Sequence, residues 1–532
     1  MLPICPTKMT RPSPHIAVIG AGIGGVSTAL RLAHAGARVS VFERHGGPGG
    51  KMRTFPSVAG PVDAGPTVLT MKHVFEDLFA DTGSALSNHV TLTKEDLLAR
   101  HFWPDGTTLD LMSDSAASEA AVCATFGKTA AAEFAAFQRR TERLFQAFDA
   151  PMMQTAAPSL MSLTALMMRK PTLIPAMAPH QTMAEALSHQ FSDPKLQQLF
   201  GRYATYVGGR PDASPALLSL IWQAEQQGVW HVTGGMHELA KAIAARAETL
   251  GARFHYNAHV TGIDVTGDRP TALRTEDGRI DIDAVCFNGD PRALAIGMLG
   301  EEVSTAVGSA AISPRSLSAC VHSFAATAHG VDLAAHNVFF CDDPATEFGP
   351  IAAGTLPCDA TLYVCAQDRF NGGTPKGPER FEIIMNAPAV ADRTALTAQE
   401  KTRCHLQIMD QLATFGLRFD PMPAIDTLTM PQHFSALFPA SNGALYGRSP
   451  HGMMAAFKRP RVRSRMKGLY LVGGGVHPGA GIPMATLCAR HAAAAMIKDL
   501  RLTSTPRQAD MPGGTSTASQ TMAPAPSRSS VS

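Results

Sequence analysis

The sequence has little cysteine, few aromatic residues and almost no net charge. Its nine cysteines are scattered and form no C-x-x-C pair, so the sequence predicts neither a disulfide framework nor a zinc site and fits a reduced cytoplasmic setting. The 46 basic residues nearly balance the 44 acidic ones, and aromatic residues make up only 6% of the chain. Without a basic excess or an aromatic stacking surface, we expect no nucleic-acid partner.

Long apolar runs are also missing. No uninterrupted run reaches the roughly 20 residues that a membrane-spanning helix needs, and residues 1–14 lack the apolar core of a signal peptide. We therefore expect no spanning segment. Nevertheless, 45% of the residues are hydrophobic, only 17% are charged, and 25 are methionines. This composition favours a large core, an oily ligand or a membrane surface as partner.

Several catalytic motifs are absent as well. The chain shows no H-E-x-x-H, Ser-His-Asp or paired-carboxylate motif, which argues against a metalloenzyme or a hydrolase and leaves no predicted metal site. Gly49, Gly50 and Lys51 are followed by Met52, where a P-loop needs serine or threonine. A P-loop nucleotide site is therefore excluded.

The most informative segment spans residues 15–43. It has an apolar β-type run over residues 16–19, a glycine-rich turn, a helical stretch closed by Gly36, and a second β-type run over residues 39–42. This is the order and length of a βαβ unit in a dinucleotide-binding fold. We therefore predict a pair of parallel strands joined by a helix.

The turn carries the G-x-G-x-x-G fingerprint as Gly20, Gly22 and Gly25. Gly20 permits a tight turn, Gly22 lets the backbone approach a pyrophosphate, and Gly25 lets the helix pack against the strand. The helix N-terminus directs free N–H groups and its positive dipole end at that pyrophosphate. Glu43 closes the second strand and can accept hydrogen bonds from ribose hydroxyls, while its charge disfavours the 2′-phosphate of NADP. We therefore predict a bound dinucleotide.

A second glycine-dense segment follows directly, from Arg44 to Arg53. Backbone N–H groups at Gly49 and Gly50, together with the cations Arg44 and Lys51, can contact phosphate oxygens. On its own this segment is equally typical of a flexible surface loop. Its position behind the ribose-binding acid favours the phosphate contact.

Two further segments carry a family resemblance. Residues 62–68 have the sequence V-D-A-G-P-T-V, and residues 473–483 have the sequence G-G-G-V-H-P-G-A-G-I-P. With the glycine fingerprint and the Gly-Gly-Lys segment, residues 14–500 resemble the phytoene-desaturase-type branch of the flavin amine oxidase superfamily. Residues 67–71 and 483–486 are most similar to the hydroxyneurosporene (1-hydroxycarotenoid 3,4-) desaturases.

The C-terminal motif predicts a strand over residues 469–472, a glycine turn and a helix that starts near Ile482. The N-terminus of this helix can stabilise negative charge on a flavin, and two helix ends that converge on one ligand favour FAD over NAD. Gly474 stands where many flavoproteins of this general type have an acid. His477 is the one titratable residue of the motif and a candidate base, although histidine before proline is equally typical of a structural hydrogen bond.

The resemblance implies an α/β fold with a Rossmann-like, discontinuous FAD-binding domain and an α+β substrate domain that carries a helical, membrane-facing part. The FAD-binding domain would comprise residues 14–80, 231–300 and 451–502, the helical part residues 81–230, the substrate sheet residues 301–450, and a disordered tail residues 503–532. It also implies that the Val260 backbone meets the adenine. The expected cofactor-contacting residues are Gly20, Gly22, Gly25, Glu43, Arg44, Gly49, Gly50, Lys51, Val260, Gly473, Gly474, Pro483 and Met484.

The middle of the chain gives coarser signals. Residues 81–228 are predicted to be mostly helical, and Gly234 and Gly235 open an amphipathic helix that ends at Gly251. Further β-type runs and a helix are expected. The strands cover residues 253–257, 260–265, 280–287, 317–324, 338–341, 362–365 and 381–386, and the helix covers residues 399–417.

Residues 151–179 are rich in methionine and leucine but contain Pro158, Pro171 and Pro175, so they cannot form one continuous helix. The flanking Arg169 and Lys170 suit phospholipid headgroups. Such a segment is more often core. The resemblance, to enzymes whose substrates live in bilayers, shifts the expectation to a cytoplasmic protein bound peripherally to a membrane. The basic run over residues 458–467 is expected to be a solvated loop.

The resemblance further implies an FAD-dependent desaturase that introduces a C3–C4 double bond into a 1-hydroxylated acyclic carotenoid, on the way to spheroidene- or spirilloxanthin-type pigments. A hydride would pass to the flavin and a proton to a side chain or water. The alternatives are a phytoene desaturase of the same fold, a flavin-dependent carotenoid isomerase and a carotenoid carrier without turnover. Oxygen and quinone both stay open as electron acceptor.

Overall fold

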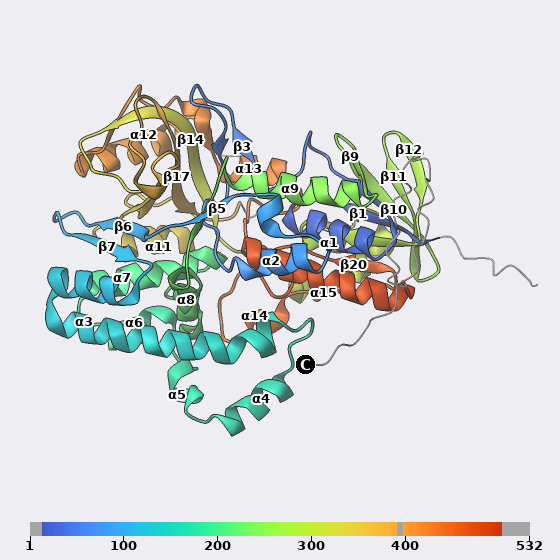
Figure 1. The fold of residues 1–532 in the computed structure, drawn as a ribbon, viewed down its shortest axis with the longest axis horizontal. Coiled ribbons are helices and arrows are strands. Elements are labelled where there is room, and N and C mark those ends of the chain that lie inside the picture. The colour runs from blue at the N-terminus through green and yellow to red at the C-terminus, as the bar shows by residue number, and fades with distance from the viewer. Residues whose placement is uncertain (1–12, 391–396, 503–532) are drawn as a thin grey trace, which may run out of the picture.

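A computed structural model describes residues 13–390 and 397–502 (Figure 1). The expected disordered tail over residues 503–532 lies outside the described residues. One lobe is built on a parallel sheet and carries both ends of the described chain. The other lobe is built on a mixed sheet with a layer of helices beneath it (Figure 1). Two lobes that meet along one crevice give an α/β fold with room for a ligand between them.

The first lobe is a five-stranded parallel sheet with the order β20-β13-β1-β2-β9. Its strands are β1 (His15–Ile19), β2 (Arg38–Phe42), β9 (Arg253–His255), β13 (Ala284–Phe287) and β20 (Leu469–Leu471). Helices α1 (Ile23–His34), α2 (His73–Ala80), α9 (Met236–Thr249) and α15 (Ile482–Leu500) pack around it. Strands from two later parts of the sequence, residues 231–300 and 451–502, thus join β1 and β2, as the discontinuous Rossmann-like domain requires.

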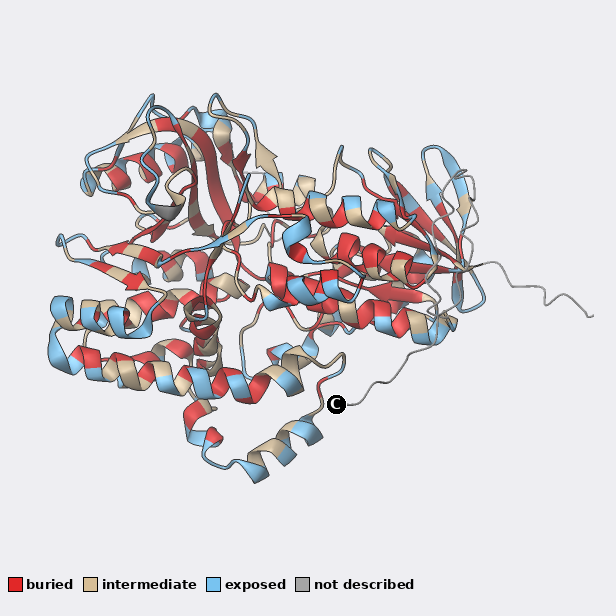
Figure 2. Ribbon diagram, viewed as in Figure 1, coloured by how far each residue is buried: buried red, intermediate tan, exposed pale blue. Residues whose placement is uncertain are grey.

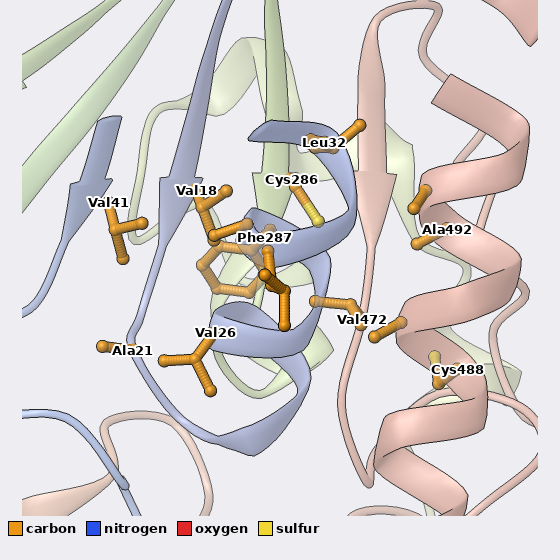
Figure 3. Close-up of a cluster of buried hydrophobic side chains, with 14 of the residues drawn as sticks. Val18, Ala21, Val26, Leu32, Val41, Cys286, Phe287, Val472, Cys488 and Ala492 are labelled. Atoms are coloured by element: carbon orange, nitrogen blue, oxygen red, sulfur yellow. The ribbon is translucent and has the colours of Figure 1, made fainter. Parts of the chain in front are cut away.

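The core of this lobe joins the two ends of the chain. Val18 of β1, Val26 of α1 and Cys286 of β13 are fully buried and belong to the same hydrophobic cluster as Cys488 and Ala492 of α15 (Figure 3). Helix α1 packs against α9 and α15, and a strand of a separate antiparallel sheet packs against β13. Strands β1, β2, β13 and β20 of the parallel sheet are therefore buried almost throughout rather than on alternate residues. Buried strands and helices have long apolar runs, which is why the sequence predicted both the βαβ unit and the C-terminal strand and helix.

One expected strand is in fact two. The sequence predicted a single strand over residues 280–287, but the structure divides it into β12 (Gly278–Asp281) and β13. β12 pairs with β11 (Arg269–Thr275), which was not predicted, and β11 pairs with β10 (Val260–Thr266) in a separate antiparallel sheet. β12 is largely exposed and β13 is buried, but residues 280–287 contain no glycine or proline that would mark the change of sheet.

The second lobe contains a mixed sheet with the order β18-β14-β17-β16-β15-β6-β7, and β19 pairs with β14 outside this path. Its central strands are the four predicted ones, with small shifts at their ends. The strands are β14 (Ser318–His329), β15 (His336–Phe339), β16 (Leu362–Ala366), β17 (Glu379–Ala387), β18 (Arg418–Asp420) and β19 (Leu428–Thr429). Helix α12 (Ala398–Thr414) has the predicted position and buries Ile408 and Leu412 in the core on one face of this sheet.

Residues 81–228 are mostly helical, as predicted, but they also contain strands that the sequence did not reveal. A hairpin of β6 (Leu97–Phe102) and β7 (Thr108–Met112) extends the second sheet, with β6 parallel to β15. Two shorter strands, β5 (Leu92–Lys94) and β8 (Trp230–Val232), pair with each other. The pairing of β6 with β15 is long-range, so local helical spacing could not reveal it.

Helices make up the rest of this segment. They are α3 (Ser115–Phe148), α4 (Leu160–Arg169), α5 (Leu173–Met177), α6 (Met183–Gln190), α7 (Pro194–Gly201) and α8 (Ile221–Gln226). Residues 151–179 are not one helix, as predicted, because α4 and α5 are separated at Pro171. No helix of the described residues is long and apolar enough to cross a membrane.

The remaining elements are short. They are β3 (Thr54–Phe55), β4 (Val62–Asp63), α10 (Pro291–Ala295), α11 (Pro344–Ala352), α13 (Pro431–Leu437) and α14 (Ala455–Lys458). The ribbon of β3 and β4 matters most for the site. Asp63 donates its N–H to the Gln367 Oε1 atom at 2.9 Å and accepts from Gln367 Nε2 at 2.9 Å, which ties the first lobe to one end of the second sheet.

Candidate cofactor and substrate cavity

A cavity of about 900 Å³ lies between the two lobes. Every expected cofactor-contacting residue except Gly25 lines it. These residues are Gly20, Gly22, Glu43, Arg44, Gly49, Gly50, Lys51, Val260, Gly473, Gly474, Pro483 and Met484. The fold therefore brings the glycine segments from both ends of the chain to one site.

The two N-terminal glycine segments touch each other. Gly22 and Gly49 form an isolated parallel bridge, and the Gly49 N–H donates to the Ala21 carbonyl at 2.9 Å. A Cβ atom on Gly50 would lie 3.1 Å from the Gly22 Cα atom. Side chains at these positions would push the two segments apart and fill the space that a pyrophosphate needs.

Gly25 has a different position. A Cβ atom there would lie 2.0 Å from the carbonyl oxygen of Gly20, so only glycine lets α1 approach the end of β1 this closely. This is the packing role that the sequence predicted for it. Asn288, at the end of β13, secures the same turn by donating from Nδ2 to the Gly20 carbonyl at 3.2 Å.

Glu43 lies at the carboxyl end of β2 and is almost completely buried. Its Oε2 atom accepts from the Ala21 N–H at 2.7 Å, and its Oε1 atom accepts from the His45 N–H at 2.9 Å. Two backbone donors therefore fix the carboxylate in the cavity wall. A carboxylate oxygen can accept more than one hydrogen bond, so capacity for ribose hydroxyls is left.

Two helix N-termini open onto the cavity. Helix α1 begins after Gly22 and α15 begins after Gly481, and the first residue of each helix lines the cavity. Neither helix has an acidic residue in its first turn. The free N–H groups and positive dipole ends are therefore uncompensated and suit an anionic ligand.

Lys51 is the cation closest to these glycines in the chain. Its side chain keeps accessible surface because it borders the cavity, and its Nζ atom donates to the Leu445 carbonyl. The surrounding protein desolvates the ammonium and lowers the pKa of Lys51 to about 8, while Asp290 opposes this shift. An anion in the cavity would restore the charged form.

His477 does not line the cavity, although Pro478 next to it does. Its ring is buried, and its Nε2 atom lies 2.9 Å from the Thr155 carbonyl, to which it can donate. Burial lowers the pKa of His477, so the ring is neutral at physiological pH. This geometry fits the structural alternative that the sequence left open and gives no route to a substrate proton.

The second sheet supplies cavity residues that the sequence analysis missed. Along β17, Glu382, Ile384 and Asn386 line the cavity, while the residues between them face the hydrophobic core on the other side. Tyr363 of β16 lies beside them, and its hydroxyl hydrogen-bonds Thr67 Oγ1 at 2.8 Å. The one available signal was a glutamate in the middle of an apolar β-type run.

The other wall of the cavity is apolar. It is formed by residues of α3 and α8 and of the segments that precede α4 and α8: Phe145, Met153, Leu217, Leu218, Leu220, Ile221 and Ala224. Glycine turns at one end and aliphatic or aromatic side chains at the other suit a dinucleotide and a long apolar ligand in one continuous space. The described residues contain no group of three or more His, Cys, Asp or Glu that could hold a metal ion.

Comparison with known proteins agrees with this arrangement. Residues 23–309 match the family model described as flavin containing amine oxidoreductase. The hydroxyneurosporene desaturase of Cereibacter sphaeroides is 51% identical over 92% of this chain and 98% of its own length, and that of Rhodobacter capsulatus is 49% identical over 92% and 99%. The structure of cyclohexylamine oxidase from Brevibacterium oxydans superposes with a TM-score of 0.56 at 16% identity, covering 92% of this chain and 100% of that chain.

Proposed function

The chain belongs to the flavin-containing amine oxidoreductase family and, within it, to the hydroxyneurosporene desaturases, and we propose on this premise that it introduces the C3–C4 double bond into 1-hydroxylated acyclic carotenoids. It is an FAD-dependent oxidoreductase of carotenoid biosynthesis. The observation that carries the proposal is the single cavity that joins the glycine turns to an apolar wall.

The residues present fit FAD. The contacts between Gly22, Gly49 and Gly50 leave room for a pyrophosphate but not for side chains. Glu43 would hold the ribose hydroxyls, Lys51 and the N-terminus of α1 the phosphates, and the N-terminus of α15 the pole of the flavin that becomes negative. When bound, the flavin supplies the hydride acceptor for the reaction.

The protein's own task is to place and shield an apolar chain. Desaturation breaks two C–H bonds on adjacent carbons, and one hydrogen leaves as hydride while the other leaves as a proton. Residues 64–67, which follow β4, line the cavity, and Leu218 and Ile221 line it from the helical part of the second lobe. Such walls align the polyene and keep water from the reacting carbons.

The substrate is proposed to enter from a membrane surface. Helix α4 buries none of its residues, and three of its apolar side chains are largely exposed: Met161 by 81%, Met168 by 79% and Leu160 by 54% (Figure 2). Arg169 ends this helix, and Lys170 follows it. An exposed apolar face flanked by cations suits peripheral contact with an anionic bilayer.

The cavity lies close to this face. Leu217 and Leu220 line the cavity and also pack against the small hydrophobic cluster that includes Leu173 and Ala176 of α5. A carotenoid leaving the bilayer beneath α4 and α5 would therefore meet apolar side chains along the way to the cofactor. This supports the proposed peripheral membrane association.

Incubation of the flavin-loaded protein and lipid vesicles with defined carotenoids tests the function. We expect 1-hydroxyneurosporene to lose two hydrogens, as read by mass spectrometry, and phytoene to remain unchanged. Conversion of phytoene instead would identify a phytoene desaturase. A product of unchanged mass but altered double-bond geometry would identify an isomerase.

A further inference from the structure

Glu382 is a buried carboxyl group without a partner. It lies in the middle of β17 between β14 and β16, has no exposed surface, and lines the cavity. Neither of its carboxyl oxygens has a hydrogen-bond partner within residues 13–390 and 397–502. A buried polar group left unpaired is costly, so an orphan of this kind in a cavity wall indicates a missing ligand.

The direction of the side chain follows from the alternation of the strand. Phe381 and Ile383, on either side of Glu382, lie in the core beneath α12, whereas Ile384, which is two residues further on, lines the cavity. Residues two apart on a strand share a face. Glu382 therefore faces the same space that the cofactor-lining glycines face.

Glu382 lies in the half of β17 that is nearer the β3–β4 ribbon, which is the cofactor end of the strand. The β3–β4 ribbon crosses the sheet there, since Gln367 binds the backbone of Asp63 and the Arg380 Nη1 atom donates to the Pro61 carbonyl at 3.1 Å. The cavity-lining residues 64–67 follow directly after this ribbon. Asn386, at the other end of the strand, is already bound by Glu347 at 2.8 Å.

The neighbouring cation is engaged elsewhere. The Arg53 Nη2 atom donates to Thr429 Oγ1 at 3.3 Å, and its guanidinium lies 5.8 Å from the centre of the Phe434 ring. Burial raises the pKa of Glu382 well above its usual range, and Asp63 raises it further, while Arg53 opposes the shift. Burial therefore favours the neutral carboxylic acid, which offers one O–H donor and an acceptor.

A neutral acid complements a hydroxyl group. Both groups donate one hydrogen bond and accept others, so a single alcohol satisfies the carboxyl without burying a charge. A cationic ligand would leave its own charge buried beside a neutral acid. An ordinary carotene would offer no polar atom and would leave Glu382 unpaired.

Resting on the proposed function, we propose that Glu382 is the specificity-determining residue that binds the C1 hydroxyl of the carotenoid and thereby sets C3 and C4 beside the cofactor. C1 and C3 are separated by a single carbon, so a hydroxyl fixed at the cofactor end of β17 keeps the reacting bond at that end too. The apolar remainder of the chain then extends along the aliphatic wall.

Binding of two carotenoids that differ only in this hydroxyl tests the proposal. Quenching of tryptophan fluorescence gives the affinity for 1-hydroxyneurosporene and for neurosporene, with flavin absorbance as a check of cofactor content. We expect the wild type to prefer the hydroxylated carotenoid by roughly 10- to 100-fold. Glu382→Leu should remove this preference by weakening only the hydroxylated ligand, and Glu382→Gln, which keeps a donor and an acceptor, should retain most of it.

A second measurement relies on an isosteric variant. Infrared difference spectra should show that a protonated-carboxyl C=O band, assigned by its loss in Glu382→Gln, shifts when 1-hydroxyneurosporene binds and stays in place with neurosporene. An unchanged preference in Glu382→Leu, or an unshifted band, would overturn the proposal. Loss of turnover with intact binding and preference in Glu382→Gln would also overturn it, because the carboxyl would then act as a proton acceptor.

Failure of this proposal differs from failure of the proposed function. A wild type that converts phytoene and ignores 1-hydroxyneurosporene refutes both. A wild type that desaturates 1-hydroxyneurosporene, combined with an undiminished preference for the hydroxyl in Glu382→Leu, refutes the role of Glu382 alone.

Discussion

Gly24 of α1 and Gly473, after β20, pack directly against each other: a Cβ atom on Gly24 would lie 3.0 Å from the Gly473 Cα atom. The turn that opens the first helix and the turn that precedes the last helix therefore form one wall. Asn288 lies between them, since a Cβ atom on either glycine would come within 2.8 Å of its Oδ1 atom. This close approach is what lets two distant segments border a single cofactor.

Replacing Gly22 should abolish cofactor retention. A Cβ atom at this position would lie 2.9 Å from Asn288 Nδ2, and the larger side chain of Gly22→Val would also enter the space between Gly22 and Gly50. We expect the purified variant to lack the flavin absorbance while its circular dichroism stays that of the wild type. Gly47→Ala is the matched control, because a Cβ atom there meets nothing within 4 Å. A yellow, active Gly22→Val would contradict the cofactor assignment.

Removing the Glu43 carboxylate should weaken flavin binding. Glu43→Ala leaves the N–H groups of Ala21 and His45 without their acceptor and removes the expected ribose contact. Hydrogen bonds to a charged group contribute about 1.5–3 kcal/mol, so the dissociation constant of FAD should rise roughly 10- to 100-fold in titrations of apoprotein. Glu76→Gln, an exposed change on α2, should leave it as in the wild type. Equal affinities in all three proteins would count against the role of Glu43.

The pH dependence of flavin affinity should follow Lys51. Burial lowers the pKa of its ammonium from 10.5 to about 8, so the folded protein without an anion loses this proton before the unfolded chain does. Between these two pH values the unfolded state binds more protons, and the Lys51 contribution to apoprotein stability therefore rises with pH. The electrostatic attraction between the Lys51 ammonium and a phosphate instead decreases as the pH rises, because the ammonium loses its charge. FAD affinity should fall above pH 8 in the wild type and fall less steeply in Lys51→Met, and identical profiles would refute this role.

Polar substitutions on α4 should release the protein from membranes. Met161 and Met168 are 81% and 79% exposed, so Met161→Ser with Met168→Ser removes apolar surface without disturbing the core. The affinity for anionic vesicles, measured by cosedimentation, should decrease more than about 100-fold, because burying each of the two methionine side chains is worth about 1.5–3 kcal/mol. Met422→Ser, at another exposed methionine, is the control. Unchanged cosedimentation of the double variant would exclude α4 as the contact.

Local sequence patterns predicted the elements that local physics determines. The strand, turn and helix around Gly20 and the strand and helix around Gly473 have short-range signatures, because glycine positions and apolar runs are set within a few residues. The helix from Met236 and the four central strands of the second sheet also agree with the structure. Each of these is recognisable without knowing its neighbours.

The features that the sequence did not reveal depend on pairing between strands. The β6–β7 hairpin is stabilised by the pairing of β6 with β15, and β11 is stabilised by its pairing with both β10 and β12. Glu382 stood out only once the fold placed its strand against the cavity. For His477 the local sequence was misleading. Its position within a glycine-rich motif made it a candidate base, but its ring contacts the Thr155 carbonyl and does not line the cavity.

The most direct test of the central claim is a single anaerobic turnover. The flavin-loaded protein, in lipid vesicles and without oxygen or quinone, is mixed with one equivalent of 1-hydroxyneurosporene while the flavin absorbance is recorded. We predict that the yellow absorbance bleaches in step with the appearance of a carotenoid that has lost two hydrogens. A flavin that stays oxidised while the carotenoid is bound, isomerised or unchanged would contradict the account.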